Sequence, residues 1–191
     1  MKFWEYYTDG DHFFTLVFAN FERDKWLFFR DLKPGLIPEP IQGITVQYET
    51  QSKDLSPSQR ALLRKGRLPK GDFPSLNGVQ IVFSEKALDV LWPLIQNNVQ
   101  VIPLECEDEP LFLIHVTRFI DGLDLEHSNY KWLVENKAIS DVNHFVFHEE
   151  KTKGENIFRM PLNFPSVYVS DTFKAAVEEH GLKGLLWKPL P

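Results

Sequence analysis

The chain has 191 residues, of which 43% are hydrophobic and 25% charged, a composition typical of a folded globular protein. That length suits one domain or two small ones, and it is sufficient to bury a core without disulfides or metal. A single cysteine, Cys106, excludes an internal disulfide framework and a site with several thiolate ligands. No apolar run approaches the ~20 residues of a membrane span, and the N-terminus does not resemble a secretory signal. We therefore expect a cytoplasmic protein without a membrane partner.

The formal net charge is −6, which disfavours extended contact with nucleic acid because affinity for phosphates comes mainly from clustered Lys and Arg. The negative charge is concentrated between residues 105 and 126, where seven carboxylates accompany one arginine, Arg118. These carboxylates are Glu105, Glu107, Asp108, Glu109, Asp121, Asp124 and Glu126. Residues 53–70 have the opposite balance, with six Lys and Arg side chains and one Asp. Both stretches are compatible with solvated faces, and the acidic one also with a surface that meets a basic partner.

The first thirty residues are rich in aromatic side chains, and stretches such as residues 13–18 and 25–29 favour strands. Acidic residues accompany these aromatics, so we interpret them as core rather than as a platform for stacked bases. A Pro- and Gly-rich segment then interrupts regular structure before an expected strand over residues 44–48. We expect residues 1–75 to form an aromatic-rich β region that packs on an α+β region, residues 76–191.

A short helix is expected after Ser56. Ser56 and Gln59 have the spacing of a capping box, with Pro57 at the first helical position. Gly66 is placed to end this helix. The residues that follow, 67–78, have the composition of a loop.

Two further serines each follow an expected strand and precede an expected helix. Ser84 follows a strand over residues 79–83 and begins a broadly apolar, buried helix, which Pro93 should kink or end. Ser170 follows a strand that ends at Val169, and its helix should end before Gly181. Other strands are expected over residues 99–104, 111–119, 143–147, 157–160 and 185–188. Helices and strands without regular alternation predict an α+β fold, with a mixed or mainly antiparallel sheet and a few short helices.

The sequence lacks the common motifs for phosphate, dinucleotide or zinc binding and for a serine nucleophile. His144 and His148 are four residues apart, as zinc ligands on a helix would be, but the residues around them alternate as in a strand. We therefore expect no metal, no cofactor and no catalytic residue.

One acidic segment offers an alternative. Asp121, Asp124, Glu126 and His127 could hold Mg²⁺ through their carboxylates, as in a metal-dependent hydrolase. The structural interpretation is a turn at Asp121-Gly122 followed by a charged surface segment.

Short motifs follow one another in a fixed order over the C-terminal two-thirds of the chain. They comprise an Asp-x-Leu-Asp segment with a serine four residues later, an Ile-Phe-Arg element, a Ser-Asp helix start and a final Gly-x-x-Gly turn. Their residues are Asp121, Leu123, Asp124, Ser128, Ile157, Phe158, Arg159, Ser170, Asp171, Phe173, Gly181 and Gly184. This order resembles the immunity proteins of bacterial polymorphic toxin systems, in the group numbered family eleven. The resemblance covers roughly residues 75–191, and residues 1–70 match less well.

The resemblance implies a protein that is not an enzyme, is encoded beside a toxin, often a nuclease, and protects its producer by binding the toxin's catalytic domain. An acidic protein can mimic the nucleic acid that a basic nuclease binds, and complementary charge speeds association. An interaction module with another protein partner is the second interpretation. For the contact itself, we expect Glu107, Asp108 and Glu109 to face the partner from an exposed loop. Asp121 and Asp124 should instead bond the backbone of their own turn.

Overall fold

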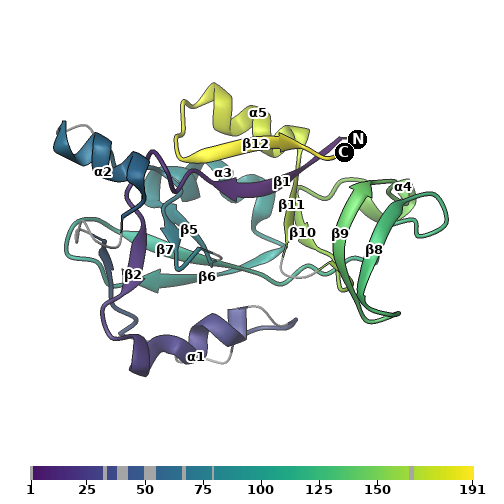
Figure 1. The fold of residues 1–191 in the computed structure, drawn as a ribbon, viewed down its shortest axis with the longest axis horizontal. Coiled ribbons are helices and arrows are strands. Elements are labelled where there is room, and N and C mark those ends of the chain that lie inside the picture. The colour runs from purple at the N-terminus through teal and green to yellow at the C-terminus, as the bar shows by residue number, and fades with distance from the viewer. Residues whose placement is uncertain are drawn as a thin grey trace.

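The computed structural model describes residues 2–31, 34–37, 43–49, 55–65, 68–78, 80–163 and 166–191. Within these residues the chain forms a four-stranded sheet, a six-stranded sheet, a two-stranded hairpin and five short helices (Figure 1). Almost all neighbouring strands are antiparallel, and the pair β2 and β4 is parallel. The predicted α+β fold is confirmed.

The four-stranded sheet joins the two ends of the chain. Its order is β10 (Ile157–Arg159), β11 (Val167–Ser170), β1 (Phe3–Thr8) and β12 (Leu185–Pro189). Because β1 pairs with both β11 and β12, the termini lie side by side (Figure 1). The N-terminal aromatics are thereby built into a sheet whose other strands come from the C-terminal region.

The six-stranded sheet carries the first part of the acidic stretch, residues 105–110, in the loop between two of its strands. Its order is β3 (Val46–Tyr48), β2 (Leu16–Phe18), β4 (Ser75–Leu76), β5 (Gln80–Ser84), β7 (Leu111–Val116) and β6 (Val99–Leu104). Leu104 of β6 pairs with Leu111 of β7, so residues 105–110 form the loop of a hairpin. The strand predicted over residues 99–104 is confirmed, and β4 lies in the segment that was predicted to be a loop.

The predicted serine caps are all present. The helices are α1 (Phe21–Asp31), α2 (Pro57–Arg64), α3 (Glu85–Ile95), α4 (Glu149–Thr152) and α5 (Asp171–Glu179). The hydroxyl oxygens of Ser56, Ser84 and Ser170 each accept a backbone N–H in the first turn of α2, α3 and α5, and Ser56 completes the predicted capping box. Gly66, the expected end of α2, lies outside the described residues. Helix α3 continues two residues beyond Pro93, because a proline in the last turn removes only one intrahelical bond.

The strand predicted over residues 25–29 is wrong, because these residues belong to α1. The side-chain oxygen of Asn20 accepts the Arg23 N–H at 3.1 Å, which satisfies a free donor of the first turn. Glu22 and Asp24 in that turn also favour the positive end of the helix dipole. Capping and charge therefore outweigh the strand preference of the aromatic residues.

The C-terminal half contains a hairpin that the sequence did not reveal, formed by β8 (Asn129–Val134) and β9 (Ala138–His144). The strand predicted over residues 143–147 is wrong in its extent, because β9 ends at His144 and His148 precedes α4. Strand β7 ends at Val116, three residues short of the prediction. The next two residues leave the strand, because the backbone N–H groups of Thr117 and Arg118 both donate to the Asn98 carbonyl. The predicted strands near residues 157–160 and 185–188 are present as β10 and β12.

Three clusters of buried side chains hold the layers together. The first joins α3 and α5 to one face of β5 and β7 and to the four-stranded sheet. The second lies on the other face of the six-stranded sheet, under Leu27 of α1. The third fills the space between the four-stranded sheet and the hairpin of β8 and β9. Helices α1 and α3 therefore cover opposite faces of the six-stranded sheet (Figure 1).

Candidate functional site

The acidic loop, residues 105–109, lies between β6 and β7 at the edge of the six-stranded sheet. It lines a surface hollow together with Thr45, Leu104 and Pro110. Glu107 and Asp108 are exposed, and Glu109 is half-buried. Within the described residues Glu107 makes no hydrogen bond or ion pair, so its carboxylate is open to a partner.

Two side chains from outside the acidic loop hold its C-terminal half. The Tyr48 hydroxyl donates a hydrogen bond to Glu109 at 2.5 Å. The Lys70 ammonium lies 3.1 Å from Asp108 and 3.9 Å from Glu109, and it also stands over the Tyr48 ring. Burial and the Glu109 carboxylate raise the pKa of the Tyr48 hydroxyl far above its usual range, so it stays a donor at any physiological pH. One residue of the basic stretch therefore neutralises part of the acidic loop within the same chain.

The N-terminal half of the acidic loop is connected to α1. Thr45 donates from its hydroxyl to the Glu105 carboxylate at 3.2 Å, and the Glu105 carbonyl accepts the Val46 N–H. The Arg23 guanidinium of α1 reaches the Thr45 hydroxyl at 3.3 Å. It also binds the nearly fully buried Asp24 with two hydrogen bonds of 2.7 and 2.8 Å. The start of α1 is thus fixed beside Glu105.

The remaining acidic residues lie away from the acidic loop, because β7, about 20 Å long at ~3.3 Å per residue, separates the two groups. Asp124 accepts hydrogen bonds from the backbone N–H groups of Glu126 and His127 at 3.0 and 3.2 Å, and from the His127 ring at 2.8 Å. These bonds lower the pKa of the Asp124 carboxyl, and the bond from the His127 ring has the largest effect. Asp121 and Glu126 are exposed. The turn lies at residues 125–127, not at Asp121-Gly122 as predicted, because Asp124 organises the residues that follow it.

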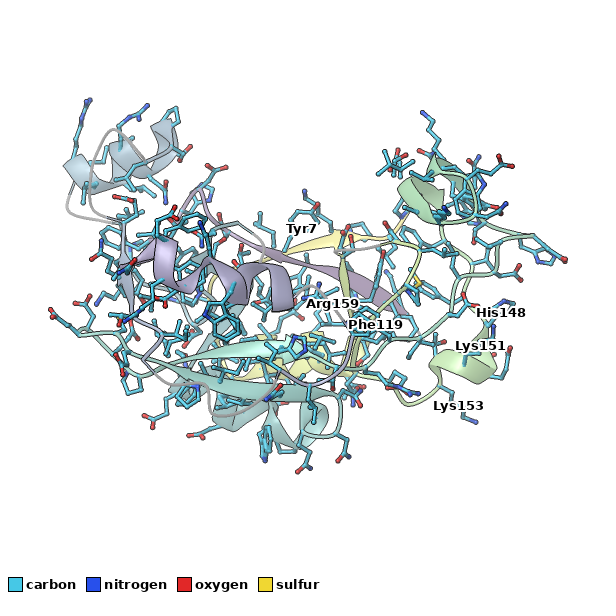
Figure 2. All side chains as sticks on the ribbon, turned by 90° about the horizontal axis from the view of Figure 1, so that it is seen from below. Tyr7, Phe119, His148, Lys151, Lys153 and Arg159 are labelled. Carbon is cyan, nitrogen blue, oxygen red and sulfur yellow. The ribbon has the colours of Figure 1, made fainter. Side chains whose placement is uncertain are left out.

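The residues that carry the family resemblance support the fold. Ser128 bonds both backbone groups of Val146, and Asp171 accepts the Trp4 indole N–H at 2.8 Å. Arg159 is fully buried and lies beside Phe119 in the interior, whereas His148 lies at the periphery near α4 (Figure 2). The contacts of Ser128 and Asp171 hold segments of the fold together, and Arg159 lies in the core.

The two histidines with the spacing of zinc ligands lie on different elements. His144 is exposed at the end of β9, and His148 stands before α4, so the two histidines do not share a strand. In the part of the chain that the structure describes, no three His, Cys, Asp or Glu side chains are grouped so that they could hold a metal ion.

Sequence reasoning missed the two side chains that hold the acidic loop, Tyr48 and Lys70. Each is more than thirty residues away from the loop in sequence, and no local pattern joins them to it. The opposite charges of residues 53–70 and 105–126 were the one signal in the sequence that the two segments could meet. Lys70 makes that contact through its ion pair with Asp108.

A family model described as an immunity protein family (Imm11) matches residues 56–190. No curated protein matches the chain. The match includes α2, the acidic loop and the capped helices α3 and α5, and it leaves β1, β2, α1 and β3 outside. Among the described residues, none of the helices has the length and apolar character needed to cross a membrane.

Proposed function

The chain belongs to the immunity protein family Imm11, and on that basis we propose that it binds and neutralises a cognate toxin domain of the nuclease type. It acts in the cytoplasm of the producing cell and catalyses no reaction itself. The family match over residues 56–190 is the observation that carries this proposal. The acidic loop and the net charge of −6 support it, because a nuclease binds phosphates through a basic surface.

We place the toxin contact on the acidic loop, with Glu107 and Asp108 facing the partner. Both carboxylates are exposed; within the described residues Glu107 makes no hydrogen bond or ion pair, and Asp108 is paired with Lys70. Glu109 has a different role, because its bond to Tyr48 positions the loop. Complementary charges at the rim of an interface mainly accelerate association, since they steer the partners before they touch.

The test is the association rate with the C-terminal domain of the protein encoded immediately upstream. One variant reverses two charges in the acidic loop, Glu107→Lys and Asp108→Lys. A matched control reverses two exposed charges of the other group, Asp121→Lys and Glu126→Lys, and therefore has the same net charge. The loop variant also removes the Asp108–Lys70 ion pair, whereas both variants keep the Tyr48–Glu109 bond and the bonds of Asp124.

We expect the loop variant to associate about tenfold more slowly at low salt and to lose most of its salt dependence, because nearby charges dominate steering. The control should change the rate by about twofold at most. Equal slowing in both variants would mean that only the total charge matters, and an unchanged rate in the loop variant would remove the acidic loop from the contact.

A further inference from the structure

The acidic loop is too small to form a stable interface alone. A specific protein–protein contact takes about 20–30 residues from each side. The surface continues from the acidic loop in two directions. One leads through Lys70 toward α2, and the other leads through Thr45 and Arg23 onto α1.

Charge distinguishes the two directions. Lys70 is paired with the acidic loop, but the α2 side beyond it exposes Arg64 and Lys65, which would repel the same basic surface that the acidic loop attracts. On α1, Arg23 is paired with Asp24, and Lys25 is paired with Glu22 at 2.5 Å. The first two turns of α1 are therefore electrically neutral and can approach a basic partner without repulsion.

The α1 side also offers a large aromatic side chain. Trp26 is 44% exposed. It lies three residues after Arg23, so both side chains project from one side of the helix, the side that Arg23 directs toward Thr45. Tryptophan is among the residues that most often dominate binding energy, especially when it fills a pocket inside a polar rim.

We propose that Trp26 is the apolar anchor of the toxin interface, inserted into an apolar pocket that adjoins the toxin's basic surface. The inference rests on the proposed function and extends it from the acidic loop to a composite surface. The carboxylates of the acidic loop form the charged rim, and Trp26 forms the part that excludes water.

The residues on either side of Trp26 fix its position on the surface. Its neighbour Leu27 is fully buried against the six-stranded sheet, and Asp24 is 1% exposed. Helix α1 is held on both sides of Trp26, so little conformational freedom is lost when a partner binds. Trp26 precedes residues 56–190, the part that the family model matches. Helix α1 would thus provide contacts specific to this chain's own toxin.

The experiment compares two tryptophans of similar exposure on opposite faces of the six-stranded sheet. Trp26→Ala removes the proposed anchor, and Trp92→Ala is the matched control on α3, where Trp92 is 41% exposed. The probe is the purified C-terminal domain of the upstream-encoded protein, and binding kinetics are measured with the full chain. We expect Trp26→Ala to raise the Kd by about 30-fold. Most of this change should be faster dissociation, since most interface substitutions act on the dissociation rate. Trp92→Ala should stay within about twofold of the wild type.

A second measurement needs no variant. Hydrogen exchange of the wild-type chain should show added protection in α1 and in the acidic loop when the toxin domain is bound, and none in the exposed turn of α3 around Trp92. Equal affinity of both tryptophan variants, or an α1 that gains no protection in the complex, would overturn the anchor. If the wild-type chain does not bind the toxin domain, the proposed function itself fails, and the two failures are therefore distinguishable.

Discussion

Replacement of Ser170 by alanine tests how the C-terminal helix is built onto its strand. The Ser170 side chain is fully buried and bonds in two directions. Its oxygen accepts the Phe173 N–H at 3.1 Å, and its hydroxyl donates to the Asn156 side-chain oxygen at 2.7 Å. Ser170→Ala removes both bonds and leaves the Phe173 amide, at the start of α5, without its partner.

The expected loss follows from these two bonds. A lost serine cap costs about 1 kcal/mol, and a buried group deprived of its hydrogen bond costs about 1–3 kcal/mol. We therefore expect Ser170→Ala to lower the free energy of unfolding by about 2–4 kcal/mol. With an m value near 2–3 kcal/mol/M, the urea midpoint should fall by about 1 M.

Urea unfolding followed by tryptophan fluorescence and by circular dichroism measures this shift. The control is Ser58→Ala, an exposed serine in the first turn of α2 that does not cap the helix, which should stay within about 0.5 kcal/mol of the wild type. A Ser170→Ala protein that unfolds at the wild-type midpoint would refute the capping argument.

Two further predictions concern the segment between β7 and β8. Gly122→Ala should destabilise the chain by about 1–3 kcal/mol, because the added Cβ would lie 2.8 Å from a methyl group of the buried Thr152. Thermal unfolding measures this loss, and an unchanged melting temperature would contradict the close packing. Asp124→Asn should be less stable than the wild type at pH 7. Because folding lowers the Asp124 pKa, this difference should persist above about pH 4 and disappear as the pH falls through the folded-state value. Unfolding midpoints at several pH values test it, and a difference that stays constant down to pH 2 would exclude the carboxylate as its source.

Local signals in the sequence were sufficient to place several helices. The caps at Ser56, Ser84 and Ser170 could be predicted because a cap depends on residues within one turn of it. Helix α1 was mistaken for a strand because its aromatic content was weighed above Asn20 and the acidic first turn. The same local rule, applied to Asn20, would have found it.

Non-local pairing was beyond such rules. The position of β1 between β11 and β12 joins residues more than 160 apart, and no pattern in β1 specifies these partners. At the candidate site, the expectation of an exposed loop is confirmed for Glu107 and Asp108, whereas Glu109, for which the sequence predicted the same, is half-buried. The sequence could not show that Glu109 is held by Tyr48, because that contact depends on how β3 docks beside the β6–β7 hairpin.

Co-purification tests the central claim most directly. The chain, carrying an affinity tag, is expressed together with the C-terminal domain of the upstream-encoded protein, and the eluted complex is analysed for stoichiometry and for residual cleavage of nucleic acid. The account predicts that the two proteins elute together in a fixed ratio and that the bound toxin domain cleaves no nucleic acid. A toxin domain that elutes separately, or that stays fully active beside an excess of the chain, would contradict it.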